Sequence, residues 1–255
     1  MRSTAVSGRL FVVGLGPGDP DWLTPEAARV LAEATDLVGY APYLERVPVR
    51  AGQLRHASDN RVEVERAQHA LALASEGRAV AIVSGGDPGI FAMAAAVFES
   101  VEYGETGWRD LSIEVLPGIT AMQAAAARVG APLGHDFCAI SLSDNLKPWD
   151  LIEKRLRAAA EADFVIALYN PASKARPDRI GAAFALLMKH KSAETPVLLA
   201  SAVGRSDERI TITTLATADL SHVDMSTLVL VGSSTTRLIP RPLGRPWLYT
   251  PRGAA

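Results

Sequence analysis

Apolar and polar positions follow two rhythms along the chain. Short runs rich in Val, Ile and Leu predict buried strands, and they lie at residues 9–15, 79–84, 111–116, 164–169 and 195–201. Stretches with apolar positions at helical spacing lie between several of these runs, at residues 24–34, 61–77, 121–130 and 149–162. Strands that alternate with helices favour right-handed crossovers and mainly parallel sheets. The pattern therefore predicts an α/β fold.

The last part of the chain departs from this alternation. Residues 209–215 and 226–232 have the pattern of strands with little helix between them, so antiparallel pairing is expected there. A strand meets Pro117 and Gly118 in "LPGIT", which gives the best boundary between two domains, 1–117 and 118–255. We therefore expect two α/β domains with mainly parallel, partly mixed sheets and an active-site cleft between them.

The composition is typical of a globular enzyme, with 48% hydrophobic and 21% charged residues among 255. A formal net charge of −2 gives no general basic field for nucleic acid. Cys138 is the only cysteine, which excludes an internal disulfide, a thiolate zinc cluster and an iron–sulfur centre held by this chain alone. In "HDFCAISLS" it is expected to be a small buried apolar residue rather than a nucleophile.

Apolar runs in this chain are too short to predict a membrane span, since none approaches ~18 residues. The first apolar stretch leads directly into a glycine loop with no cleavage-type segment, so we expect no signal peptide. With a single cysteine, a reducing cytoplasm is the expected location.

The loop "VGLGPGDPDWLT", Val13 to Thr24, follows the first predicted strand. Phosphate is an unsuitable ligand for it, because Pro17 and Pro20 remove N–H donors and the next helix begins only near Thr24. The spacing is G-x-G-x-G rather than the dinucleotide fingerprint. The loop favours a ligand with little need for N–H donors, and Asp19 can serve as an acceptor. The alternative is a tight turn without a ligand.

Two further glycine segments follow later strands. In "SGGDPGI", from Ser84, Asp87 either caps a helix that begins at Pro88 or belongs to a ligand site at the carboxyl edge of the sheet. In "PGITAMQAA", from Pro117, Thr120 and Ala121 open a helix of small side chains. Those small residues indicate either close helix packing or room for a ligand.

Together and in this order, the three segments resemble the tetrapyrrole (corrin/porphyrin) methylase family. The resemblance continues through "ALYNPASKARP", "ASAVGRSDERITITTL" and "TLVLVGSS", and so covers nearly the whole chain. "HASDNRVEVERA", "LSDNLKPWDLIEKR" and "YNPASKARP" most resemble the members that methylate carbon 17 of precorrin-3B in cobalamin biosynthesis. The resemblance implies a class III methyltransferase that uses S-adenosylmethionine, has two α/β domains and acts as a homodimer.

The resemblance also implies the site residues, position by position. The residues expected to line the S-adenosylmethionine pocket are Pro17, Gly85, Gly86, Asp87, Ile90, Thr120, Ala121, Tyr169 and Gly204. The implied reaction includes ring contraction of the precorrin, which needs a general base and an acid near the ring. Asp19 and Asp144 are the expected catalytic carboxylates, and no metal site is expected.

A precorrin carries several carboxylates, which arginine binds bidentately. The basic candidates fall in three stretches, and they are Lys174, Arg176 and Arg179, then Arg205 and Arg209, then Arg46, Arg50, Arg55 and Arg61. Arg176 and Arg205 are the two expected to bind substrate. For each candidate the alternative is a solvated surface charge.

Other functions remain open on sequence grounds. Another tetrapyrrole methylase, acting on a cobalt-precorrin or on uroporphyrinogen III, is the nearest alternative, and a non-catalytic tetrapyrrole-binding protein is a second. The net charge disfavours the ribosomal-RNA methylases of the same broad family, and the two prolines in the first loop disfavour an NAD(P)-dependent oxidoreductase.

Overall fold

The computed structural model describes residues 8–59, 62–173 and 175–253. The chain divides into two compact units, Met1–Thr120 and Ala121–Ala255. The expected boundary after Pro117 falls three residues before this division. We refer to the two parts as unit 1 and unit 2.

Unit 1 is built on a fully parallel five-stranded sheet in the order β3-β2-β4-β1-β5. The strands are β1 (Arg9–Gly14), β2 (Asp36–Tyr40), β3 (Leu54–Ser58), β4 (Ala79–Ser84) and β5 (Ser112–Leu116). The helices are α1 (Pro25–Glu33), α2 (Ala41–Leu44), α3 (Glu63–Ser75) and α4 (Met93–Tyr103), with 3-10 turns η1 (Pro20–Trp22) and η2 (Thr106–Asp110). Parallel strands joined through helices confirm the predicted α/β fold.

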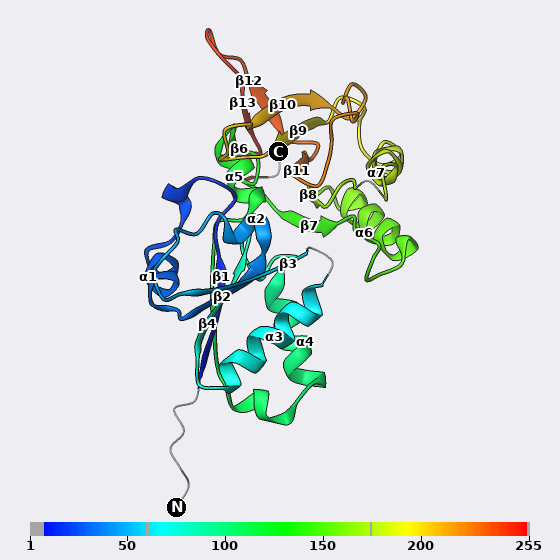
Figure 1. Ribbon diagram of the computed structural model, residues 1–255. Helices are drawn as coiled ribbons and strands as arrows, with labels where there is room; N and C mark the ends of the chain where they lie inside the picture. Colours follow the sequence, from blue (N-terminus) through cyan, green and yellow to red (C-terminus); the bar gives the residue numbers. More distant parts are fainter. Residues whose placement is uncertain (1–7, 60–61, 174, 254–255) are drawn as a thin grey trace, which may run out of the picture. The chain divides into compact units, whose positions relative to one another are not determined.

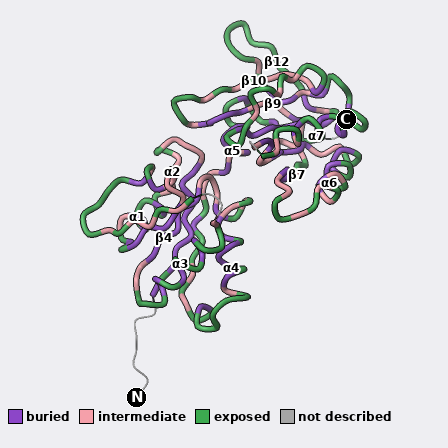
Figure 2. The backbone as a smooth tube through the Cα atoms, turned by 45° about the vertical axis from the view of Figure 1, so that its right-hand side comes forward, coloured by how far each residue is buried: buried purple, intermediate pink, exposed green. Residues whose placement is uncertain are grey.

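Helices cover both faces of this sheet, as Figure 1 shows. Successive side chains of a strand point to opposite faces, and β1 illustrates the result. Leu10 and Val12 pack in the cluster with α3 and α4, whereas Phe11 and Val13 pack in the cluster with α1 and α2. Burial on both sides explains why β1 and β4 are continuous apolar runs, the purple strands of Figure 2.

The start of α1 follows its sequence signals. Thr24 caps the helix, its hydroxyl accepting the N–H of Ala27 at 3.1 Å, and Pro25 occupies the first helical position.

The alternative that Asp87 caps a helix beginning at Pro88 is wrong. The helix α4 begins five residues later, at Met93, because Phe91 has a φ of 52° and so interrupts any regular helix before it.

Unit 2 contains a mixed five-stranded sheet in the order β10-β9-β11-β8-β7 and a small sheet in the order β12-β13-β6. The strands are β6 (Gly130–Ala131), β7 (Phe137–Ser141), β8 (Val165–Tyr169), β9 (Pro196–Ser201), β10 (Arg209–Thr214), β11 (Thr227–Val231), β12 (Arg237–Ile239) and β13 (Trp247–Tyr249). The helices are α5 (Ala121–Ala127), α6 (Trp149–Glu161) and α7 (Arg179–Leu187). β10 and β11 pair antiparallel to their neighbours, which confirms the predicted change of pairing.

The larger sheet of unit 2 packs against α6 and α7 through a single hydrophobic cluster that includes Leu156, Leu168 and Phe184. Strand directions place the carboxyl ends of β7, β8 and β9 at one edge. β7 is parallel to β8, and β8 and β9 both run antiparallel to β11, which lies between them. This edge positions the chemistry-bearing loops of unit 2.

Candidate functional site

The carboxyl ends of β4, β1 and β5 bring four glycines together in unit 1. We call Gly14, Gly16, Gly86 and Gly118 the glycine corner. Gly16 and Gly86 form an isolated antiparallel bridge, with the Gly16 N–H donating to Gly86 O at 3.1 Å and the Gly86 N–H donating to Gly16 O at 2.9 Å. The two glycine loops expected from the sequence are therefore joined main chain to main chain.

Side chains have no room in the glycine corner. A Cβ at Gly118 would lie 2.3 Å from Gly86 O, and a Cβ at Gly14 would lie 2.7 Å from the Gly118 nitrogen. Gly16 has a φ of +67°, a left-handed conformation that L side chains rarely adopt. Glycine is required here for close approach of three segments, which is the reason for the glycine pattern in the sequence.

The N–H groups of the glycine corner are already used inside the protein. The Leu15 N–H donates to Ser84 O at 2.9 Å, in addition to the two bonds of the Gly16–Gly86 bridge. A phosphate cradle needs such N–H groups directed at the anion. The hydrogen bonding therefore agrees with the conclusion from the sequence that this loop does not suit phosphate.

Asp87 fixes the second glycine segment to the third. One carboxylate oxygen accepts the Gly89 N–H at 2.8 Å, and the other accepts the Gly118 N–H at 3.0 Å. A carboxylate with both oxygens held by main-chain donors is a rigid group. Asp87 thus lies beside the glycine corner and has a structural role there, while its expected place in the cofactor pocket stays a prediction.

Gly85 differs from its neighbours. Its main chain forms no hydrogen bond with the main chain of another described residue, and the residue is half-buried. A Cβ there would meet the ring of Tyr43 at 2.7 Å. A main-chain donor and acceptor left open beside an aromatic ring suit a ligand with a flat apolar part and polar substituents. These features fit S-adenosylmethionine.

The other expected residues of unit 1 lie close in sequence to this corner. Pro17 and Ile90 are half-buried, and Thr120 is buried. The carboxylate of Asp19 accepts the Asp21 N–H at 3.0 Å and so caps the 3-10 turn η1, which the sequence did not predict. The catalytic role of Asp19 stays a prediction.

Tyr169 ends β8 at the carboxyl edge of unit 2. Its hydroxyl accepts the N–H of Met122 at 3.1 Å, at the start of α5, the helix that Ala121 begins. Asn170 follows with a φ of 52°, and its amide donates to the Ser141 hydroxyl at 2.9 Å, which ties the ends of β8 and β7 together. Asn170 and Ser141 were not expected from the sequence, although Asn before Pro171 is a turn signal.

Gly204 lies in the loop after β9, at the same edge. It has a φ of +79°, and its N–H donates to the Glu208 carboxylate at 2.7 Å. Glu208 in turn pairs with Arg128 at 3.0 Å, so the loop is held to the residues that follow α5. Ala121, Tyr169 and Gly204 thus belong to unit 2, whereas Pro17, Gly85, Gly86, Asp87, Ile90 and Thr120 belong to unit 1.

Asp144 lies in the loop between β7 and α6, paired with two arginines. Arg179 donates to one carboxylate oxygen at 2.5 Å, and Arg176 approaches the other at 3.5 Å. Burial works to raise the pKa of Asp144, but the hydrogen bond and charge of Arg179 and the charge of Arg176 outweigh it, so the pKa lies below its ordinary value. A lowered pKa makes Asp144 a weaker base.

The remaining basic candidates divide by environment. Arg205 and Arg209 are exposed, while the guanidinium groups of Arg46 and Arg55 donate to main-chain carbonyls. Lys174 and Arg61 lie outside the described residues. Substrate binding by Arg176 and Arg205 stays a prediction.

Cys138 lies on β7 and is partly buried against the core of unit 2. Burial raises the pKa of its thiol, and the charge of Lys191 offsets only part of this effect. A raised pKa lowers the thiolate fraction, so the thiol is a poor nucleophile. This agrees with the expectation that Cys138 is a packing residue, although it is less buried than expected.

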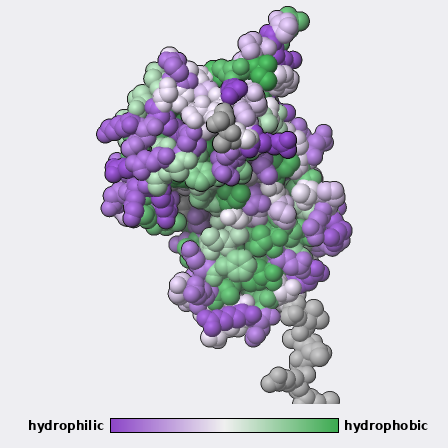
Figure 3. Space-filling model, turned by 180° about the vertical axis from the view of Figure 1, so that it is seen from behind, coloured by the Kyte–Doolittle hydropathy of each residue, from purple (hydrophilic) through white to green (hydrophobic). Residues whose placement is uncertain are grey.

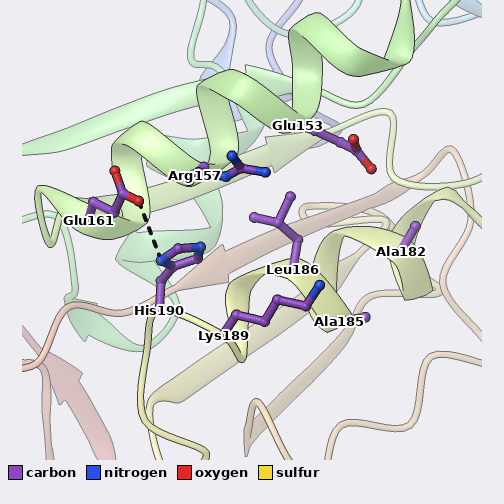
Figure 4. Close-up of a pocket in the computed structure, with 8 residues that line it drawn as sticks. All are labelled: Glu153, Arg157, Glu161, Ala182, Ala185, Leu186, Lys189 and His190. Carbon is purple, nitrogen blue, oxygen red and sulfur yellow. Dashed lines mark ion pairs between the residues drawn. The ribbon is translucent and has the colours of Figure 1, made fainter.

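One surface groove of unit 2 is remote in sequence from the glycine corner. It lies between α6 and α7, has a volume of about 620 Å³, and is lined by charged side chains with few apolar ones, as Figure 4 shows. Glu161 and His190 form an ion pair across it at 3.6 Å. A shallow groove of mixed charge without convergent polar groups does not resemble a small-molecule site, and it contains none of the expected residues.

The outer surface carries apolar side chains as well as charges. In unit 1 the large exposed ones include Val64, Phe98 and Tyr103, and Figure 3 shows apolar side chains gathered on one face of this unit. Among the described residues, no helix combines the length and apolar character needed to cross a bilayer. The same residues contain no group of three or more His, Cys, Asp or Glu placed to share a metal ion.

Comparison with known proteins agrees with the architecture. The sequence model of the tetrapyrrole (corrin/porphyrin) methylase family matches residues 9–219 of this chain. A precorrin-3B C(17)-methyltransferase from Sinorhizobium sp is 56% identical over 248 residues, which cover 97% of this chain and 97% of that protein. The crystal structure of the methyltransferase CobJ superposes with a TM-score of 0.91 at 51% identity, covering 96% of this chain and 100% of that one.

A more distant solved structure shares the fold. It is a uroporphyrin-III C-methyl transferase from Thermus thermophilus complexed with S-adenyl homocysteine, with a TM-score of 0.66, 23% identity, and coverage of 88% of this chain and 97% of that one. The parallel sheet with its glycine corner, the mixed sheet and the family match lead to one assignment. This chain belongs to the tetrapyrrole (corrin/porphyrin) methylase family.

Proposed function

We propose that this chain transfers a methyl group from S-adenosylmethionine to carbon 17 of precorrin-3B, a step of cobalamin biosynthesis. The observation that carries the proposal is the 56% identity, over 97% of both chains, to a relative with this named activity. The 51% identity to the methyltransferase CobJ supports methyl transfer as the reaction class.

The glycine corner and its surroundings are the proposed cofactor site of unit 1. S-adenosylmethionine supplies an electrophilic methyl group, so the protein has only to orient the reactants and exclude water. In unit 1, Gly85 offers an open main-chain donor and acceptor, and Asp87 holds Gly89 and Gly118 in place. Pro17, Gly86, Ile90 and Thr120 complete the proposed set.

Unit 2 carries the other three residues that the resemblance implies for the cofactor, which are Ala121, Tyr169 and Gly204. The phenol of Tyr169 fixes the start of α5, and the Gly204 N–H is held by Glu208. The cleft between the domains that the resemblance implied stays a prediction. Binding of S-adenosylhomocysteine, measured by calorimetry, tests the cofactor part of the proposal independently of any substrate.

Substrate recognition is assigned to arginines, because a precorrin presents several carboxylates. Arg176 and Arg205 are proposed to bind them. Arg176 is oriented by Asp144 at 3.5 Å and by the carbonyl of Leu142, to which it donates at 3.4 Å. A guanidinium fixed in this way retains N–H groups for a second acceptor.

The ring contraction that the resemblance implies needs proton transfer, since a hydroxyl proton leaves as a ring bond migrates. Asp19 and Asp144 are the proposed groups. We would replace each residue by Asn. For Asp144, the Asn variant distinguishes a general base from a group that only orients Arg176. A base would lose turnover at saturating substrate, whereas a group that only orients Arg176 would raise the KM for precorrin at nearly constant kcat. If both variants retain wild-type methylation and contraction, neither residue acts as the base.

The product tests the proposal as a whole. Incubation of the protein with precorrin-3B and S-adenosylmethionine should add one methyl mass and change the absorption spectrum to that of a contracted ring. Turnover only with a cobalt-containing precorrin or with uroporphyrinogen III would assign another methylase activity. Tetrapyrrole binding without methyl transfer would assign a carrier.

Assembly and location complete the proposal. The resemblance implies a homodimer. Light scattering on the protein as it elutes from a size-exclusion column measures its molar mass and so tests this state. The single cysteine, with a raised thiol pKa, is compatible with the reducing cytoplasm.

A further inference from the structure

We propose that Arg46 is a positioning residue for the first glycine loop, and that Arg55 acts on the loop through Arg46. The two arginines form a relay that runs from β3 to the carboxyl end of β1. The relay itself is independent of what the loop binds, while its effect on ligand affinity rests on the proposed function. The sequence offered both arginines as candidates for binding precorrin carboxylates, with a solvated surface charge as the alternative, but their guanidinium groups donate to the main chain.

Arg46 holds the loop at its turning point. One terminal nitrogen of its guanidinium donates to Leu15 O at 2.9 Å and to Gly16 O at 3.0 Å. Two consecutive carbonyls that accept from one nitrogen must point in the same direction, which fixes both peptide planes. Gly16 O also accepts the Gly86 N–H at 2.9 Å. Arg46 therefore acts on both glycine loops at the atom where they meet.

Arg55 holds the segment that carries Arg46. From β3, its guanidinium donates to the carbonyls of Leu44, Val47 and Pro48, each at 2.8 Å. These three carbonyls belong to the end of α2 and the turn after it, on both sides of Arg46. Among the described residues no carboxylate lies within ion-pair distance of Arg55. Its charge is directed to carbonyl oxygens, which accept charge-assisted hydrogen bonds.

The same segment also contacts the second glycine loop. The ring of Tyr43, in α2, would lie only 2.7 Å from a Cβ added at Gly85. The same ring packs edge-on against Tyr40, with ring centroids 5.4 Å apart. Residues 43–46 therefore touch the loop after β1 through Arg46 and the loop after β4 through Tyr43. One short segment therefore supports both loops beside the Gly16–Gly86 bridge that joins them.

The physical effect of the relay is preorganisation. The backbone of Gly16 is left-handed, with a φ of +67°, and glycine loses more conformational freedom on ordering than any other residue. A loop that is already ordered does not need to be ordered by its ligand, which raises affinity. Arg46 achieves this without contact with the ligand, and so differs from a catalytic residue.

The test uses Arg46→Met, which keeps an unbranched apolar stem and removes the guanidinium donors. Hydrogen exchange of the unliganded protein should be faster at the amides of Leu15 and Gly16. The Kd for S-adenosylhomocysteine should rise about tenfold, the size expected for loss of charge-assisted hydrogen bonds. The KM for the methyl donor should rise, while kcat should stay within about twofold of the wild-type value. Arg46→Lys, which restores a donor, should recover part of each change.

Arg55→Met should produce the same changes to a smaller extent, and the double variant should not be worse than Arg46→Met alone, because the two act in series. Arg29→Met is the matched control. Arg29 lies on α1, its side chain is 60% exposed, and its ion pair with Glu26 spans 3.8 Å. The Arg29→Met variant should leave the hydrogen exchange of the loop, the Kd for S-adenosylhomocysteine and the KM for the methyl donor unchanged.

Wild-type exchange and affinity in Arg46→Met would overturn the proposal, as would an equal effect in the Arg29→Met control. If the wild type binds no S-adenosylhomocysteine while Arg46→Met still speeds exchange of the loop, the relay stands and the proposed function fails. If Arg46→Met does not fold, Arg46→Lys and Arg55→Met carry the same comparison.

Discussion

At Gly14 and Gly118, the main chain of a neighbouring segment occupies the space in which any other residue would carry its side chain. The sequence showed these glycines and their prolines, and it indicated that phosphate is an unsuitable ligand. It could not show that Gly14, Gly86 and Gly118 contact one another, since they are remote in the chain and only the order of the parallel strands brings them together.

We predict that Gly118→Ala destabilises the protein. The added Cβ would lie 2.3 Å from Gly86 O, which belongs to rigid backbone, and overpacking of this kind typically costs about 1–3 kcal/mol. Urea unfolding measures the change. Gly107→Ala is the control in the same unit, because nothing lies within 4 Å of its added Cβ. Equal stability of the two variants would show that the corner can yield.

Asp36 provides the second prediction at this scale. It is 1% exposed, and it accepts from His56 at 2.9 Å and from Arg78 at 3.0 Å. Burial works to raise its pKa, but the bonds from His56, Thr35 and Arg78 together lower it. A folded pKa below the unfolded value of about 3.9 stabilises the fold above that pH, and the contribution is lost as pH falls through the folded pKa.

Asp36→Asn should therefore lower the free energy of unfolding by about 2–3 kcal/mol near neutral pH. The difference from wild type should shrink as the pH is lowered below about 4. Urea titrations across the acid range measure both effects. Asp110→Asn, at an exposed site, should leave the whole profile unchanged. A difference between Asp36→Asn and wild type that is independent of pH would contradict the linkage.

Elements with strong patterns were predictable, and weak ones were not. The apolar runs gave β1, β4, β8, β9 and β11 almost to the residue, because strands buried on both faces carry no polar interruptions. β3, "LRHAS", was missed because it is an edge strand with polar side chains whose partners lie elsewhere in the fold. The short strands β12 and β13 were missed for a similar reason, since most of their side chains are exposed.

The start of α5 gives a prediction at the element scale. The first N–H groups of a helix have no partner within the helix, and here the hydroxyl of Tyr169 accepts the Met122 N–H at 3.1 Å. Tyr169→Phe removes this acceptor while it keeps the ring. We expect a loss of about 1–2 kcal/mol in the free energy of unfolding and weaker binding of S-adenosylhomocysteine. Tyr103→Phe is the control, since Tyr103 is 80% exposed; matching effects in the two would reject a capping role.

For the whole molecule, each unit has hydrophobic clusters of its own. The two clusters of unit 1 and the one of unit 2 share no residue. Leu71 in α3 and Leu156 in α6 are both fully buried. We predict that Leu71→Ala and Leu156→Ala each cost about 2–5 kcal/mol, and that amide exchange rises first within the unit that carries the substitution. A uniform rise throughout the chain would show a single cooperative core.

The order of strands in unit 1 also affects how the chain must be made. β1 is synthesised before both of its neighbours, which are β4, at residues 79–84, and β5, at residues 112–116. On the ribosome, both edges of β1 stay unpaired, and the side chains from Leu10 to Val13 stay uncovered, until those distant partners emerge. Unpaired apolar strands are prone to intermolecular association. Among the strands of unit 1, β1 therefore waits longest for a partner, and a chaperone that covers it would protect unit 1 during synthesis.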